Sequence, residues 1–72
     1  MNADNNIRKA RALSGMSQAK LAAALGVSER TLRSYETGAP VPSTVLAELA
    51  RITGCSVDFM LGLSVWVSIR GP

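Results

Sequence analysis

Two short helices joined by a tight turn, in the middle of the chain, constrain the fold most. Ser17 and Ser28 each stand where a helix begins, and a serine oxygen there can accept a hydrogen bond from an unpaired backbone N–H. Gly26 lies between the helices, where the backbone leaves helical geometry and a residue without a Cβ is tolerated best. The sequence therefore predicts one helix over 17–24 and another over 28–37.

Each of these helices has an apolar side. The expected inward residues are Leu21, Ala22, Ala24 and Leu25 in the first helix, and Leu32 and Tyr35 in the second. Helices this short are not stable alone, so their apolar sides must pack on further helices. The outer side of the second helix is polar and carries arginines, which suits a helix that lies in a DNA major groove.

Helix start and stop residues predict another helix before this pair. Asp4 or Asn5 can cap a helix over 6–13, which is expected to end near Gly15. Residues 39–42, Ala-Pro-Val-Pro, cannot be helical at their centre because each proline pushes the preceding residue to extended geometry.

Two helices are expected after this proline loop. Ser43 is predicted to cap the first, which ends at Gly54, and Ser56 is predicted to cap a short one that ends at Gly62. The inward side of the longer helix is expected to consist of Val45, Leu46, Leu49 and Ile52. The fold class is therefore all-α, a compact arrangement of five helices over residues 1–62.

The segment after residue 62 changes its pattern from helical to alternating. Apolar residues at every second position, together with Trp66, predict a half-buried β-strand within 63–72. A single strand in a helical domain has no partner for its backbone, so we expect it to pair with its copy in a homodimer. A linker that folds back or leads into a further domain is the alternative. The expected dimerisation residues are Leu63, Val65, Trp66, Val67 and Ile69.

Several short motifs follow one another along residues 5–62. They are Arg11, Ser-Gln-x-x-Leu-Ala at 17–22, Leu-Gly-Val-Ser at 25–28, Leu32, Glu-x-Gly at 36–38, and the stretch 49–61. Together they resemble the phage-repressor and Cro-type (lambda-repressor-like) helix-turn-helix family of transcription regulators. The resemblance implies a DNA-binding domain over 1–62. The chain departs from the family at 39–41, where Ala-Pro-Val replaces the usual lysine or arginine and predicts fewer phosphate contacts.

The resemblance also implies which side chains meet DNA. Base contacts are expected at the first two positions after Ser28 and again one turn later. These positions are Glu29, Arg30 and Ser34, flanked by Arg33. Arginine suits the guanine O6/N7 pair, and glutamate can accept from cytosine N4. The alternative for Glu29 and Arg33 is an i,i+4 surface ion pair. Contacts to the DNA backbone are expected from Gln18, Ser17, Lys20, Thr31 and Thr37.

Arg11 and Glu36 are charged residues on otherwise inward-facing sides of their helices. A lone buried ion costs several kcal/mol, so each must be paired. We expect an Arg11–Glu36 ion pair between the first and third helices, and the family has the same pair. These residues are interpreted as structural, setting the angle of the third helix.

Composition excludes most other classes of protein. There is no histidine, and the single cysteine, Cys55, is expected to be a buried hydrophobic residue. The acidic residues show no convergent spacing and no Gly-rich phosphate loop is present, so no enzyme, cofactor, metal or small-molecule ligand is expected. A polar N-terminus and short apolar runs predict no membrane association and a cytoplasmic location. The net charge of +3 weakly favours a polyanionic partner.

Two functional hypotheses remain. The first is a sequence-specific regulator, a repressor that binds double-stranded DNA as a two-fold dimer on a pseudo-palindromic operator. The second is an antitoxin-type interaction module, in which the C-terminal strand joins the sheet of a different protein.

Overall fold

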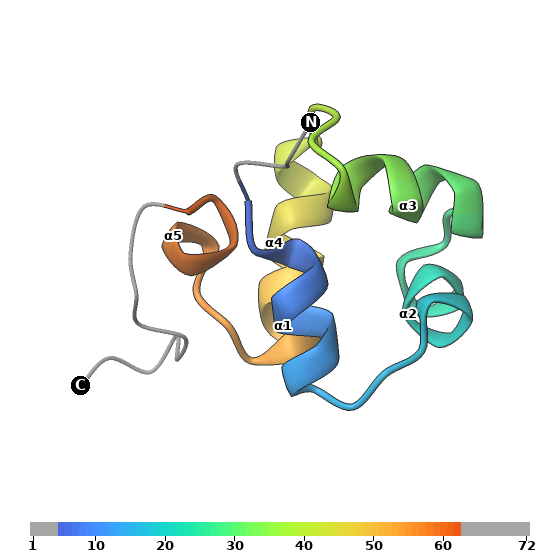
Figure 1. Cartoon of the computed structure of the whole chain (residues 1–72), viewed down its shortest axis with the longest axis horizontal. Helices are drawn as coiled ribbons and strands as arrows, with labels where there is room; N and C mark the ends of the chain where they lie inside the picture. Colours follow the sequence, from blue (N-terminus) through green and yellow to red (C-terminus); the bar gives the residue numbers. More distant parts are fainter. Residues whose placement is uncertain (1–4, 63–72) are drawn as a thin grey trace.

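Five α-helices make up residues 5–62, the part of the chain that the computed structural model describes. They are α1 (Ile7–Leu13), α2 (Gln18–Leu25), α3 (Glu29–Glu36), α4 (Ser43–Thr53) and α5 (Val57–Met60). In Figure 1, α1 and α4 occupy the centre, α2 and α3 lie together on one side and α5 lies on the other. The predicted all-α arrangement of five helices is confirmed for residues 5–62. The strand and dimerisation residues expected at 63–72 lie outside the described residues.

Serine caps start three of the helices, as predicted. The side-chain oxygen of Ser17 accepts from the backbone N–H of Lys20 at 3.0 Å, and that of Ser28 accepts from Thr31 at 3.0 Å. Ser56 accepts from Phe59 in the same way. Each bond satisfies one of the N–H groups that a helix start leaves without a partner. Because each cap involves residues only three positions apart, these helix starts can be predicted from local sequence.

The starts of the other two helices differ from the prediction. Ser43 is not a cap but the first residue of α4, and Pro42 precedes it with φ −57°. Proline suits this position because its carbonyl accepts from Leu46 at 3.0 Å while its missing N–H is not needed there. Before α1, the cap position is Asn6 instead of Asp4 or Asn5, and the Asn6 side chain makes no cap hydrogen bond. The Asn5 side chain nevertheless accepts from the N–H of Ile7 at 3.2 Å, at the start of the helix.

Two glycines end helices in the left-handed region. Gly26 after α2 and Gly54 after α4 both have φ +74°, a conformation that costs other residues about 1–2 kcal/mol. The predicted helix ends are therefore confirmed. The turn at Gly26 sets α3 against α2 in the arrangement seen on one side of Figure 1.

One hydrophobic core joins all five helices. Its fully buried large side chains are Ile7, Leu21, Leu32, Leu49 and Met60. Smaller residues, including Ala10 and Ala22, are buried beside them and let the helices approach closely. Half-buried residues at its edge include Leu25, Tyr35, Val45, Leu46 and Ile52. A mostly aliphatic core of this kind holds the domain together through apolar burial.

Ala24 was predicted to face inward, and this prediction is wrong because the residue is exposed. At about 100° per residue, the buried arc of α2 extends from Leu21 to Ala22, and Leu25 lies between them on the helical wheel. Ala24 falls beyond the edge of that arc. Cys55, by contrast, is buried, as predicted.

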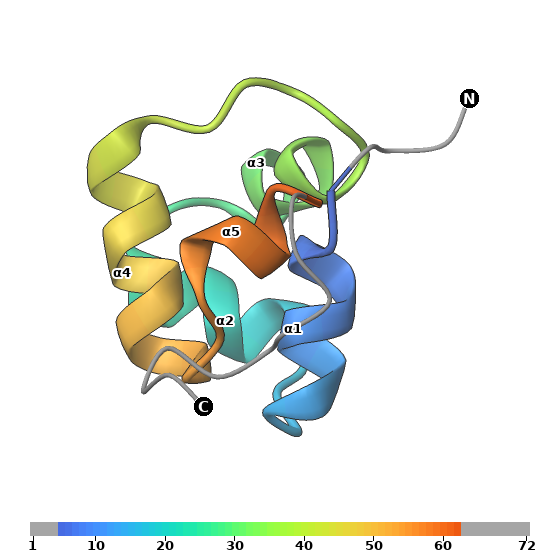
Figure 2. The same cartoon turned by 90° about the vertical axis from the view of Figure 1, so that its left-hand side faces the viewer.

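Asn6 attaches α5 to the start of α1. Its backbone N–H donates to the carbonyl of Met60 at 2.8 Å, and its side-chain amide donates to the carbonyl of Phe59 at 2.9 Å. Figure 2 shows α5 between α4 and α1, on the side of the molecule that faces the viewer. These bonds satisfy carbonyls at the end of a very short helix, which has few internal bonds of its own. None of the described helices is long and apolar enough to cross a membrane.

Candidate nucleic-acid interface

One face of α3 is buried and the opposite face is open to solvent. Leu32 and Glu36 anchor the buried face. The exposed face carries the residues that the sequence analysis singled out for DNA, namely Glu29, Arg30, Arg33, Ser34 and Thr37. Their spacing along one exposed side of a rigid helix means that a flat or grooved partner can meet all of them together.

Two hydroxyl groups on this face are already engaged as donors. Ser34 Oγ donates to the carbonyl of Arg30 at 3.2 Å, and Thr37 Oγ1 donates to the carbonyl of Arg33 at 3.0 Å. Ser34 therefore presents lone pairs, which suit an amino group, and not a proton. A bond from Thr37 to a phosphate requires its hydroxyl to rotate away from the helix carbonyls.

The charged residues of this face do not pair with one another. Between residues 5 and 62 the ion pairs are Arg11–Glu36 and Arg51–Glu48, so the alternative surface pair of Glu29 and Arg33 does not form. The Arg51–Glu48 pair lies exposed on α4, and its hydrogen bond lowers the pKa of the Glu48 carboxyl. The charges on α3 remain available to a partner.

Four of the five residues expected to meet the DNA backbone lie at the starts of α2 and α3, and Thr37 lies at the end of α3. Ser17 and Lys20 are exposed, and the Ser17 oxygen already accepts from the backbone of Lys20. Thr31 is half-buried, and its hydroxyl oxygen accepts from Ser28 at 3.0 Å. Thr31 is thus tied into the cap of α3, which leaves Ser17 and Lys20 more open to a phosphate.

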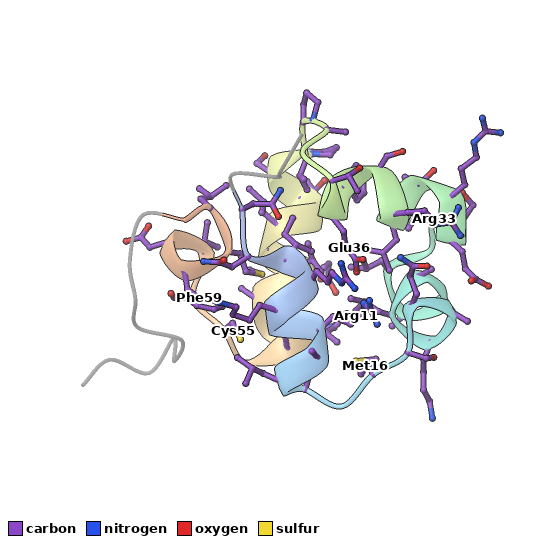
Figure 3. All side chains as sticks on the ribbon, viewed as in Figure 1. Arg11, Met16, Arg33, Glu36, Cys55 and Phe59 are labelled. Atoms are coloured by element: carbon purple, nitrogen blue, oxygen red, sulfur yellow. The ribbon has the colours of Figure 1, made fainter. Side chains whose placement is uncertain are left out.

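A buried ion pair links α1 to the end of α3. The Nε of Arg11 donates to Oε2 of Glu36 at 2.6 Å, and its Nη2 lies 3.4 Å from Oε1. The Glu36 side chain is 4% exposed and that of Arg11 18%. Arg11 also donates to the carbonyl of Met16 at 3.2 Å, which holds the loop before α2. Figure 3 shows Arg11 and Glu36 pointing toward one another between the two helices.

Gln18 is a third member of this cluster, and sequence reasoning missed that role. Its amide donates to Oε1 of Glu36 at 3.0 Å, so each carboxylate oxygen of Glu36 is hydrogen-bonded. Gln18 was expected to contact the DNA backbone, and the amide keeps a second N–H for that purpose. No spacing rule connects the first residue of α2 with the last of α3, because only the turn between them brings the two together.

An open pocket of about 360 Å³ lies where α1, α2 and α3 meet. Its lining consists of Arg8, Arg11, Gln18, Arg33, Glu36 and Thr37. Three arginines against one glutamate make it electropositive. From the sequence alone, Arg8 is a candidate for a DNA-backbone contact or a plain solvated charge, and the structure places it in the lining of this pocket together with Arg33 of α3.

Comparison with known proteins supports this geometry. A protein-family model described as Helix-turn-helix matches residues 7–60, which span all of α1 to α5. Searches of curated proteins and of solved structures returned no match. Helices α2 and α3, with the left-handed turn at Gly26, form the helix-turn-helix unit itself. The chain belongs to the Cro/C1-type helix-turn-helix family and is a DNA-binding transcription regulator.

Proposed function

We propose that α3 is the recognition helix and that it lies in the major groove of an operator. Arg30 is assigned to a guanine, Glu29 to a cytosine amino group and Ser34, as an acceptor, to an adenine or cytosine amino group. The observation that carries this proposal is that the charged side chains on the exposed face of α3 form no ion pair within residues 5–62, while the opposite face is fixed by buried Leu32 and Glu36. Because the helix is held in place and the charges of Glu29 and Arg30 are not paired within the described residues, these side chains can hydrogen-bond to base edges.

The start of α2 supplies the backbone contacts in this proposal. Ser17 and Lys20 are exposed there, and Gln18 lies between them with a free amide N–H. Contacts to phosphates fix the register of α3 in the groove without reading sequence. Lys20 therefore contributes affinity and not specificity.

The proposed regulator acts as a homodimer and represses transcription. Few side chains of one α3 reach bases, and each mismatched base pair costs only about 1–3 kcal/mol, so two half-sites are needed for useful specificity. A protein bound to an operator prevents other proteins from binding the same DNA. Repression therefore requires no contact surface beyond the one that binds DNA. The dimer is assigned to 63–72 because the sequence alternates apolar residues there. Deleting 63–72 and measuring the mass in solution tests this, and a truncated protein that still dimerises contradicts it.

Replacing Arg30 tests the orientation of α3. Arg30→Ala is expected to cost about 1–3 kcal/mol of specific binding and to relax preference at one base pair per half-site. Lys20→Ala is the matched control, because it removes one exposed positive charge and is expected to weaken all sequences equally. Affinities for a selected duplex and a random duplex are compared by fluorescence anisotropy. An Arg30→Ala protein with unchanged base preference contradicts the proposal.

A further inference from the structure

The pocket between α1, α2 and α3 has an excess of positive charge that the protein itself does not neutralise. Within it, Arg11 and Glu36 pair with one another. Arg8 and Arg33 have no ion-pair partner among residues 5–62. After the internal pair is discounted, two guanidinium groups from two different helices line one cavity.

We propose that this pocket binds one phosphate group, held between Arg8 and Arg33. Guanidinium groups present planar forks of N–H donors that match phosphate oxygens, and two of them can hold a single group from two sides. The volume of about 360 Å³ is many times the roughly 15 Å³ that one water requires, so a hydrated phosphate fits. The second amide N–H of Gln18 is a further donor to it.

Glu36 does not repel an anion from this pocket as a free carboxylate would. Its two oxygens accept from Arg11 at 2.6 Å and from Gln18 at 3.0 Å, and its side chain is 4% exposed. The negative charge is thus offset locally by Arg11. What remains open to solvent is the exposed Arg8 and Arg33.

The position of Arg33 identifies the source of the phosphate that we favour. Arg33 shares the exposed face of α3 with Arg30, and a duplex that meets Arg30 brings its sugar-phosphate backbone past this face. This step rests on the proposed function. Arg33 then contacts the backbone and not a base, and it supplies a phosphate contact that the uncharged loop 39–41 does not. A free phosphate ion offers the same chemistry and is the other possible source.

Salt dependence of binding to a random duplex tests the DNA source. Each phosphate contact contributes a slope of about 0.9 in log K against log salt. The affinity lost in Arg33→Ala should therefore shrink about 3.5-fold between roughly 50 and 200 mM salt. The Arg8→Ala/Arg33→Ala double variant should show about the same change in slope, because the two arginines hold one phosphate. Arg51→Ala, which removes an equal charge outside the pocket, should leave the slope unchanged. Circular dichroism checks that these exposed substitutions preserve the fold.

Inorganic phosphate alone tests the site without DNA. Titration followed by NMR of the arginine side-chain N–H groups should shift the signals of Arg8 and Arg33 saturably, and Arg33→Ala should abolish the shift at Arg8. If these shifts appear but the variants keep the parent's slope of log K against log salt for DNA binding, the site is one for free phosphate. A protein that shows them but prefers no DNA sequence refutes the proposed function and leaves the phosphate site standing. The inference is overturned if the arginine variants leave the salt dependence of DNA binding unchanged and phosphate causes no saturable NMR shifts. It is also overturned if Arg33→Ala alters base preference but leaves the affinity for a random duplex intact.

Discussion

The buried ion pair gives the sharpest test of how this fold holds α3. Glu36→Ala removes a carboxylate that is 4% exposed and leaves Nε of Arg11 and the amide of Gln18 without their acceptor. Removing one partner of a buried pair costs about 3–5 kcal/mol. Arg11 keeps its bond to the Met16 carbonyl and is 18% exposed, so water relieves part of the loss. We therefore expect the lower end, about 3 kcal/mol.

Thermal unfolding followed by far-UV circular dichroism measures this loss. For a small domain, about 1 kcal/mol shifts the melting temperature by roughly 4–8 °C, so Glu36→Ala should melt about 12–24 °C below the parent. Glu48→Ala is the matched control, since it breaks the exposed pair with Arg51 and should melt with the parent. Replacing Arg11 and Glu36 together by apolar residues of similar volume should cost less than Glu36→Ala. A Glu36→Ala melting temperature equal to that of the parent refutes the reasoning.

Two further substitutions test the helix-turn-helix unit by the same melting assay. Gly26→Ala should destabilise the domain by about 1–2 kcal/mol through its φ of +74° alone, because an added Cβ meets nothing within 4 Å. Gly26→Asn should cost less, since asparagine tolerates this conformation, and equal losses would argue against the backbone explanation. Ser28→Ala should cost about 1 kcal/mol by leaving the Thr31 N–H unsatisfied, whereas Ser28→Asp should retain the cap and the parent stability. A Ser28→Asp loss as large as that of Ser28→Ala would contradict the capping role.

Features set by neighbours in the sequence were predictable. The caps at Ser17, Ser28 and Ser56 and the stops at Gly26 and Gly54 each depend on a few consecutive residues, and all were found. The same local logic failed at α4, where proline and serine compete for the helix start and the proline takes the cap position.

Features set by tertiary contacts were predictable only where burial demanded them. The Arg11–Glu36 pair followed from two charges on inward faces, each of which needs a partner. No such requirement applies to Gln18, because a neutral side chain at a helix start can be solvated by water. Its bond to Glu36 could therefore not be predicted from the sequence. Asn5 and Asn6 likewise reach the carbonyls of Tyr35 and Phe59, partners far along the chain that no periodicity indicates.

The pocket was beyond sequence reasoning for a related reason. In the sequence, Arg8 and Arg33 are separate candidates for DNA contact on two different helices. Only the packing of α1 against α3 brings them to one cavity. The assignment of Arg33 as a flanking base contact came from its place on α3 alone. Its proximity to Arg8 of α1 makes Arg33 better suited to bind a phosphate than to contact a base.

Selection of bound DNA from a random pool tests the central claim most directly. If α3 of each protomer reads one half-site, the selected sequences should converge on a two-fold symmetric consensus with half-site centres about 34 Å, or one helical turn, apart. The Arg30→Ala protein should select the same consensus with one base pair per half-site relaxed. A pool that is bound without any enrichment, or an Arg30→Ala protein that selects the parent sequence unchanged, would contradict the account.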